Sequence, residues 1–115
     1  MLARSWVERV QDILDAIAEI EVFTQGMTFD VLRCDAKTIK AVELDFIVIG
    51  EAATRVPADV QAAHPEIPWH LMQAMRNRLV HAYFFVDPQI LWDTIEQDLP
   101  PLSDALTKLL DEAGN

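Results

Sequence analysis

Apolar side chains recur every three or four residues along most of the chain, which is the spacing that places them on one face of an α-helix. The first of these stripes predicts an amphipathic helix that ends near Gly26, since glycine is the usual residue just beyond a helix. Its members are Trp6, Val10, Ile13, Ile17 and Ile20. Residues 28–32 follow as a short helical turn.

A second long helix is predicted to begin after Asp35, whose short carboxylate can accept the amide hydrogens exposed at a helix start. Its apolar stripe consists of Ile39, Val42, Phe46, Ile49 and Ala53. Three further apolar residues, Leu44, Ile47 and Val48, make this surface wider than one neighbouring helix would cover. We therefore expect either the central helix of a bundle or a helix shared with a second subunit.

Prolines divide the next part of the chain. Pro57 begins a short segment, and residues 64–68 (HPEIP) form a linker, because a proline disfavours helix in the residue before it. Pro68 suits the first turn of the following helix. The buried stripe of that helix is predicted to be Leu71, Met72, Met75 and Leu79.

The last helical region is predicted to start at Asp87 and Pro88, a capping side chain followed by proline at the first helical position. Its stripe is Leu91, Ile95, Leu99, Leu102, Leu106 and Leu109. The stripe keeps its phase across Pro100 and Pro101, where we expect a kink or a break, since proline lacks a backbone donor and crowds the preceding turn. The whole pattern predicts an all-α, up-and-down bundle of about five helices in a single domain, residues 1–115.

The amino-acid composition bears on the stability of the core, on the cellular compartment and on binding to nucleic acid. Its 115 residues, 51% of them hydrophobic, are enough for a core that needs no metal or disulfide. The lone Cys34 cannot form an internal disulfide, and no secretory or membrane-spanning pattern is evident, so we expect a cytoplasmic protein with no membrane contact. A net charge of −10 argues against broad binding to nucleic acid, although nine Lys and Arg residues could gather in a local cleft.

The segment 76–83 (RNRLVHAY) resembles the R-x4-H-x-Y signature of the HepT-like branch of the HEPN superfamily. Other pieces of sequence typical of that branch occur in the same order along the chain. They are residues 49–53 (IGEAA), 67–69 (IPW), Phe84 and Phe85, and 99–100 (LP). The resemblance covers nearly the whole chain, and the ordered set is far more specific than an isolated R-x4-H.

The resemblance implies a HEPN-like helical fold and a metal-independent endoribonuclease without a cofactor, acting as the toxin of a type VII-like toxin–antitoxin system of the HepT and MntA kind. In that family a minimal nucleotidyltransferase, the MntA-like antitoxin, attaches AMP to the tyrosine of the motif. Carried onto this chain, the resemblance makes Arg76 and His81 catalytic, Asn77 a supporting residue and Tyr83 the AMP acceptor. Arg78 and Glu51 are candidates for RNA binding or support.

The residue types of the segment suit this chemistry. RNA supplies its own nucleophile, the 2′-hydroxyl, so cleavage needs a base, an acid and a cation beside the phosphorane, but no metal. Imidazole exchanges a proton near neutrality, and guanidinium donates two parallel hydrogen bonds to a phosphate. A single His81 cannot easily act on both sides of one phosphorus, so we expect a homodimer in which two copies of the segment share a cleft. The dimer would also bring Arg76 and Arg78 of both chains together.

The spacing of the motif contains one geometric difficulty. At roughly 100° per residue, Arg76 and His81 lie about 140° apart on an ideal helix, whereas Asn77 and His81 stack at i and i+4. Either the helix loosens near His81 or Arg76 reaches round it. For Glu51 we favour a structural interpretation, an ion pair or hydrogen bond to Arg76 or Arg78, while a direct role stays open.

Two other interpretations of the chain stay open. It could be a non-catalytic helical module that binds a nucleotidyltransferase and presents a substrate to it, which the acidic charge favours modestly. It could also be a purely structural bundle. No metal site is expected, because His64 and His70 lack carboxylate or cysteine partners at ligand spacing, and Trp69 and Trp92 are expected to be packing anchors.

Overall fold

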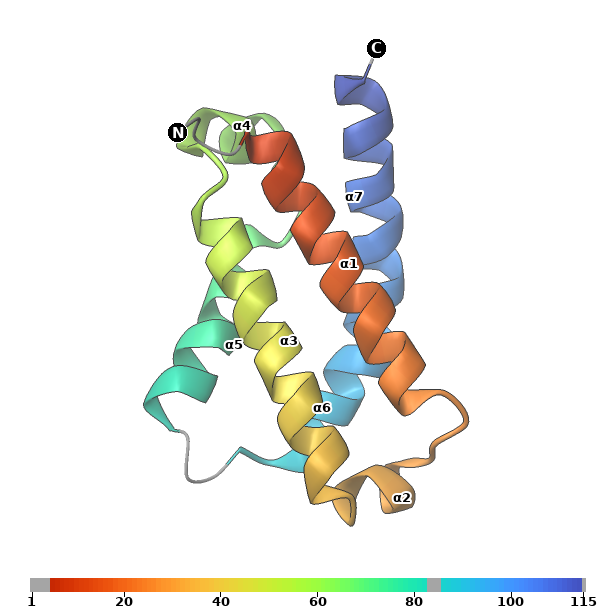
Figure 1. Ribbon diagram of the computed structural model, residues 1–115. Helices are drawn as coiled ribbons and strands as arrows, with labels where there is room; N and C mark the ends of the chain where they lie inside the picture. Colours follow the sequence, from red (N-terminus) through yellow and green to blue (C-terminus); the bar gives the residue numbers. More distant parts are fainter. Residues whose placement is uncertain (1–4, 83–85, 115) are drawn as a thin grey trace.

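The computed structural model describes residues 5–82 and 86–114, and all regular secondary structure in these ranges is helical. The elements are α1 (Trp6–Thr24), α2 (Phe29–Arg33), α3 (Ala36–Thr54), α4 (Ala58–Ala63), α5 (Trp69–His81), α6 (Pro88–Asp93), the π-helical turn η1 (Thr94–Asp98) and α7 (Leu99–Ala113). The predicted all-α class is confirmed, and successive long helices run in opposite directions (Figure 1). Because α6, η1 and α7 are continuous, the described residues form six helical segments rather than about five.

Helix α1 begins and ends where the sequence pattern indicates. The Ser5 hydroxyl accepts a hydrogen bond from the backbone N–H of Glu8, which caps the first turn. Beyond the last turn, Gly26 has φ +76°, a left-handed conformation that glycine adopts without steric cost. Four residues of the predicted stripe are almost completely inaccessible to solvent: Val10, Ile13, Ile17 and Ile20. The first predicted helix is therefore confirmed together with its buried face.

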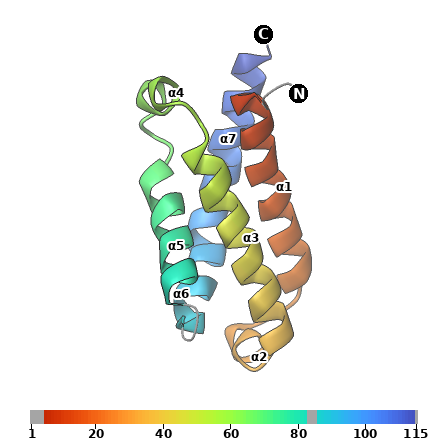
Figure 2. The ribbon, with the colours of Figure 1, turned by 60° about the vertical axis from the view of Figure 1, so that its left-hand side comes forward.

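Helix α3 is the central helix of the bundle, with α1 packed on one side and α5 on the other (Figure 2). The Asp35 carboxylate accepts a 3.0 Å hydrogen bond from the Thr38 backbone, so the predicted cap is confirmed. Four of the five predicted stripe residues are buried, Val42, Phe46, Ile49 and Ala53, and Ile39 is partly buried. By contrast, Leu44 is 62% exposed and Val48 39% exposed. The chain itself thus leaves part of the broad apolar surface of α3 uncovered.

The loop before α5 is fixed by the IPW residues. Ile67 and Trp69 are both buried, and the indole Nε1 of Trp69 donates a 3.1 Å hydrogen bond to the backbone oxygen of His64. Trp92 is partly buried beside Phe29, with ring centroids 6.5 Å apart. Both tryptophans therefore act as packing anchors, as predicted, and Trp69 sets the point from which α5 starts.

The final helical path starts at Asp87, whose side chain accepts a hydrogen bond from the Gln89 backbone, with Pro88 in the first turn. All six predicted stripe residues are buried along this path. The expected irregularity lies elsewhere, however: it is the wide turn η1, which precedes Pro100 and Pro101. A proline at 100 would crowd the carbonyl of Glu96 in a regular helix. In η1 the Leu99 N–H bonds instead to the Thr94 oxygen, five residues back, which relieves the crowding.

None of the helices within residues 5–82 and 86–114 combines the length and the apolar character needed to cross a membrane.

Candidate functional site

The site begins with a close approach of α3 and α5 at Gly50. A Cβ atom at this position would overlap the Cβ of Arg76 and lie 2.8 Å from the backbone oxygen of Met72. Only glycine lets the two helix backbones come this near. The IGEAA sequence therefore has a physical meaning here: its glycine brings the start of the RNRLVHAY segment against α3.

The residue after this glycine, Glu51, holds Arg76 in place. Its Oε1 accepts a 2.6 Å hydrogen bond from the Arg76 Nε, and the pair is a salt bridge between partly exposed side chains. The Arg76 Nη1 also donates a 3.0 Å hydrogen bond to the Oδ1 of Asn77. The ion pair expected for Glu51 is thus present, and its partner is Arg76.

These two bonds determine which edge of the Arg76 guanidinium is available. The Nε side is bound to Glu51, and one Nη1 hydrogen is bound to Asn77. Guanidinium carries five N–H donors, so the terminal Nη1–Nη2 edge keeps donors for which no described residue supplies an acceptor. Guanidinium nitrogens bind phosphate oxygens through such donors. Arg76 is therefore oriented and still able to bind an anion.

His81 is the last residue of α5 and is exposed. The helix stays regular up to this residue and ends there, because the following Ala82 has φ −117° and ψ 43°. Asn77 is exposed one turn earlier on the same helix. The predicted stacking of Asn77 and His81 therefore holds, and the bond from Arg76 to Asn77 directs the guanidinium toward their side of α5.

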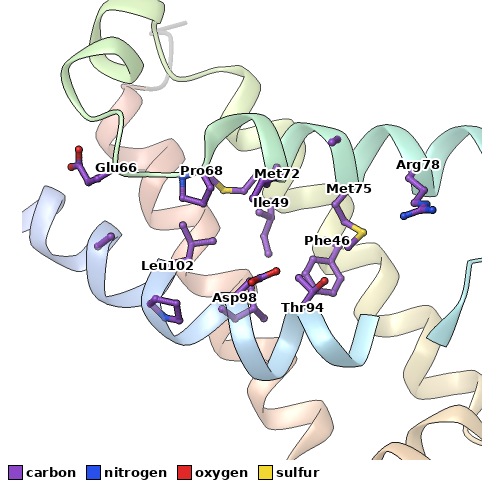
Figure 3. A pocket seen from close by; sticks show the side chains of 15 residues that line it. Phe46, Ile49, Glu66, Pro68, Met72, Met75, Arg78, Thr94, Asp98 and Leu102 are labelled. Carbon is purple, nitrogen blue, oxygen red and sulfur yellow. The ribbon is translucent and has the colours of Figure 1, made fainter. Parts of the chain in front are cut away.

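The two arginines of the segment face different ways. Arg76 is bound to Glu51 on α3, whereas Arg78 lines a groove between α5 and the η1–α7 path (Figure 3). Two residues along a helix turn the side chain by about 200°, which explains the divergence. Within one chain the structure brings Arg76, Asn77 and Glu51 together but leaves Arg78 apart from them. Tyr83, Phe84 and Phe85 lie outside the described residues.

Sequence reasoning missed a buried carboxylate on the side of α3 that faces α1. Asp45 is only 6% exposed, and its Oδ2 has no hydrogen-bond partner in the part of the chain that the structure describes. Burial, and then the nearby Glu19 carboxylate, raise the pKa of Asp45 to about 6. The residue lines a shallow acidic cleft with Asp12, Asp15 and Glu19.

No trio of His, Cys, Asp or Glu in residues 5–82 and 86–114 is arranged to hold a metal ion.

Asp45→Asn is expected to raise the free energy of unfolding near pH 7.5 by about 1–3 kcal/mol. The folded-state pKa of Asp45 lies above its ordinary value of 3.8, so the stability linked to this carboxyl is complete below that value and is lost as the pH rises through about 6. Urea unfolding of both proteins between about pH 4 and pH 8 would measure the difference. The gain should shrink toward the acid end of that range.

The matched control for this change is Asp104→Asn, which alters the net charge equally at an exposed position on α7. It should leave the free energy of unfolding almost unchanged across the same range. The assignment of Asp45 would be wrong if Asp45→Asn were no more stable than the parent near pH 7.5, or if its gain did not depend on pH.

Comparisons with known proteins give matches that include the helices of this site, α3 and α5. Residues 13–109 match the family model described as Ribonuclease HepT-like. A Thermococcus cleftensis protein named "Probable ribonuclease HepT" is 44% identical over 108 residues, which cover 94% of this chain and 98% of that protein. A Methanocaldococcus jannaschii protein named "Putative RNase" is 40% identical over 89 residues, covering 77% of this chain and 74% of that one. No solved structure is significantly similar to the chain.

Proposed function

Because the chain belongs to the HepT-like ribonuclease family, we propose that it is a metal-independent endoribonuclease whose reaction takes place at the C-terminal end of α5. The observation that carries the proposal is the arrangement of Arg76. Its guanidinium is anchored by Glu51 and Asn77 with its terminal edge still able to donate, and an exposed imidazole, His81, follows five residues later on the same helix. A fixed cation and a proton-transfer group at one site are what cleavage of RNA by its own hydroxyl requires.

The proposed reaction follows from these groups. One His81 imidazole takes the proton of the RNA 2′-hydroxyl as that oxygen attacks the adjacent phosphorus. The bond from phosphorus to the 5′-oxygen breaks, and a second, protonated imidazole gives its proton to the departing oxygen. Arg76 stabilises the negative charge on the phosphorane through its terminal nitrogens, and Asn77 keeps Arg76 oriented. The products are a 2′,3′-cyclic phosphate and a 5′-hydroxyl.

The second imidazole is proposed to come from a second copy of the chain. Each chain contributes one exposed His81 at the end of α5, so a homodimer that pairs these ends supplies both base and acid. Apolar residues near the site favour such pairing: Leu44 and Val48 on α3 are exposed, and Val80 on α5 is 36% exposed. Leu44, Val48 and Glu51 lie on successive turns of α3. A partner that covers this apolar surface would therefore lie beside Arg76.

We further propose that the protein is the toxin of a toxin–antitoxin pair in the cytoplasm and that a minimal nucleotidyltransferase neutralises it with AMP on Tyr83. Tyr83 follows His81 by two residues, so an added phosphate would bring negative charge and bulk to the cleft that must accept RNA. Incubation with ATP and the nucleotidyltransferase encoded next to this chain is expected to add AMP to Tyr83 and to stop cleavage. Peptide mass spectrometry would locate the adduct, and Tyr83→Phe should prevent it. An adduct on another residue would contradict this assignment.

A direct assay separates the nuclease from the alternative of a non-catalytic partner. The purified protein in excess EDTA is expected to cut single-stranded RNA and to leave 2′,3′-cyclic phosphate ends. Protein that binds the nucleotidyltransferase but never cuts RNA, with or without added metal, would favour the binding module, to which the net charge of −10 also lends support.

A further inference from the structure

A groove of about 460 Å³ separates α5 from the η1–α7 path, with α3 forming its floor (Figure 3). Met72 and Met75 line the α5 side, Leu102 the opposite side, and Ile49 the floor. The volume lies within the range of ordinary small-molecule sites, roughly 300–1,000 Å³. The walls are aliphatic, and methionine side chains adapt readily to flat or irregular ligands. The groove therefore has the size and lining of a ligand site.

Three charged side chains line this apolar groove: Glu66, which lies 3.4 Å from the His64 imidazole, and Arg78 and Asp98, which give the groove a direction. Arg78 stands at the end nearest the C-terminus of α5, and Asp98 projects from the opposite wall toward Ile49 (Figure 3). Neither of them makes a hydrogen bond or ion pair with another residue in the ranges 5–82 and 86–114. Met72 and Met75 precede Arg78 by six and three residues, about 9 and 5 Å along the helix. The groove thus offers a cation at one end and a two-oxygen acceptor farther in.

This order of groups matches one nucleotide of an RNA strand. The phosphate would bind to Arg78, the flat base would lie between the aliphatic walls, and the base edge would face Asp98. A carboxylate accepts hydrogen bonds but donates none when ionised. Guanine presents two adjacent donors, the N1–H and the 2-amino group, whereas uracil presents one. The acceptor in the groove therefore favours guanine over uracil.

We propose that the groove is a base-binding subsite that places a guanine nucleotide of the RNA next to the scissile phosphate, with Asp98 as its specificity residue. The inference rests on the proposed function, because Arg78 lies on the same helix between Arg76 and His81. A strand whose phosphate contacts Arg76 can pass across the exposed end of α5 and enter the groove at Arg78. The subsite gives the nuclease a sequence preference, which contacts with RNA phosphates alone would not provide.

Nucleotide binding to the full-length protein tests this subsite without any cleavage. Guanosine 5′-monophosphate, inosine 5′-monophosphate and uridine 5′-monophosphate are titrated while backbone amide shifts are followed by NMR. Inosine differs from guanosine only by the missing 2-amino group. Guanosine monophosphate is expected to shift residues of the groove and to bind about 5–10-fold more tightly than inosine monophosphate, with uridine monophosphate weakest.

Three variants test whether the preference for guanine arises at Asp98 in the groove. Asp98→Asn should bring the guanosine and inosine monophosphate affinities to within about twofold of each other, because the amide presents only one acceptor oxygen. Asp104→Asn, an equal change of charge at an exposed position of α7 outside the groove, should keep the difference. Ala105→Phe, which fills the groove, should abolish the shifts. Circular dichroism and sedimentation of each variant report whether fold and assembly are intact.

The outcomes distinguish this inference from the function on which it rests. Equal binding of the three nucleotides, or shifts confined to the surface around Asn77 and His81, overturns the subsite even if RNA is cut. Loss of assembly in Ala105→Phe, with nucleotide binding unchanged, assigns the groove to a protein contact and also overturns it. If guanosine monophosphate binds in the groove but the protein never cuts RNA, the subsite stands and the nuclease proposal fails.

Discussion

Replacing His81 by alanine is expected to lower the rate of RNA cleavage by roughly 10²–10⁴-fold, the usual contribution of a positioned acid or base. The fold should be unaffected, because His81 is exposed and is the last residue of its helix. Arg76→Ala should cause a loss of similar size, since it removes the cation that stabilises the phosphorane. The measurement is the single-turnover rate on a fluorescent single-stranded RNA, with urea unfolding of each variant alongside.

Two companion variants sharpen this test. Arg33→Ala removes a cation from α2 that is bound to Asp30, and it should leave the cleavage rate unchanged. Glu51→Gln keeps a hydrogen-bond acceptor for Arg76 but removes the ion pair, so a smaller loss, about tenfold, is expected. The ion pair is partly exposed and contributes about 0–1 kcal/mol to stability, so lost activity cannot be ascribed to unfolding.

A dimer of one parent subunit and one variant subunit tests whether the two subunits share one active site. One parent subunit combined with one His81→Ala subunit should lose nearly all activity, because either the base or the acid is then missing from the common cleft. Retention of half the parental rate would mean that each chain acts alone, and the two-subunit mechanism would be wrong.

Gly50→Ala is expected to destabilise the protein by about 1–3 kcal/mol, the typical cost of forcing an extra methyl group into a packed interface. The new Cβ would meet the Cβ of Arg76 and the backbone of Met72, neither of which can move unless α5 shifts as a whole. Urea unfolding would measure the loss. Cleavage should fall as well, because the shift carries Arg76 away from Glu51.

The comparison for this variant is a second substitution of glycine by alanine. A methyl group added at Gly26 would meet no heavy atom within 4 Å, but the φ of +76° makes alanine strained there. Gly26→Ala should therefore cost about 1 kcal/mol through the backbone while cleavage per folded molecule is unchanged. If Gly50→Ala behaves like Gly26→Ala in both measurements, the close approach of α3 and α5 is not what positions Arg76.

The helices were predictable because their signals are local. The stripes on α1, α3 and the α6–α7 path repeat at helical spacing, and Asp35 and Asp87 cap helix starts through residues only two or three positions away. The position of η1 was not predictable in the same way. Proline indicates that a helix must adjust, but the turn that adjusts depends on how the helix packs, and here it lies before the prolines.

The parts of the site that the sequence did not reveal depend on distances between helices. Asp45 is a polar position beside an apolar stripe, and only the packing of α1 against α3 buries it. The groove beside Arg78 exists because α5 packs closely against α3 but not against α7. Glu51 was correctly paired with an arginine, yet the choice of Arg76 over Arg78 required the rotation of α5 to be known.

The anchoring of Arg76 has a consequence for how tightly RNA can be held. A free arginine side chain has about 2 kcal/mol of rotamer entropy, which binding to a phosphate would remove. In this protein Glu51 and Asn77 already restrict the side chain before any RNA arrives. The ordering therefore happens when the chain folds, and more of the attraction between guanidinium and phosphate remains available to the transition state.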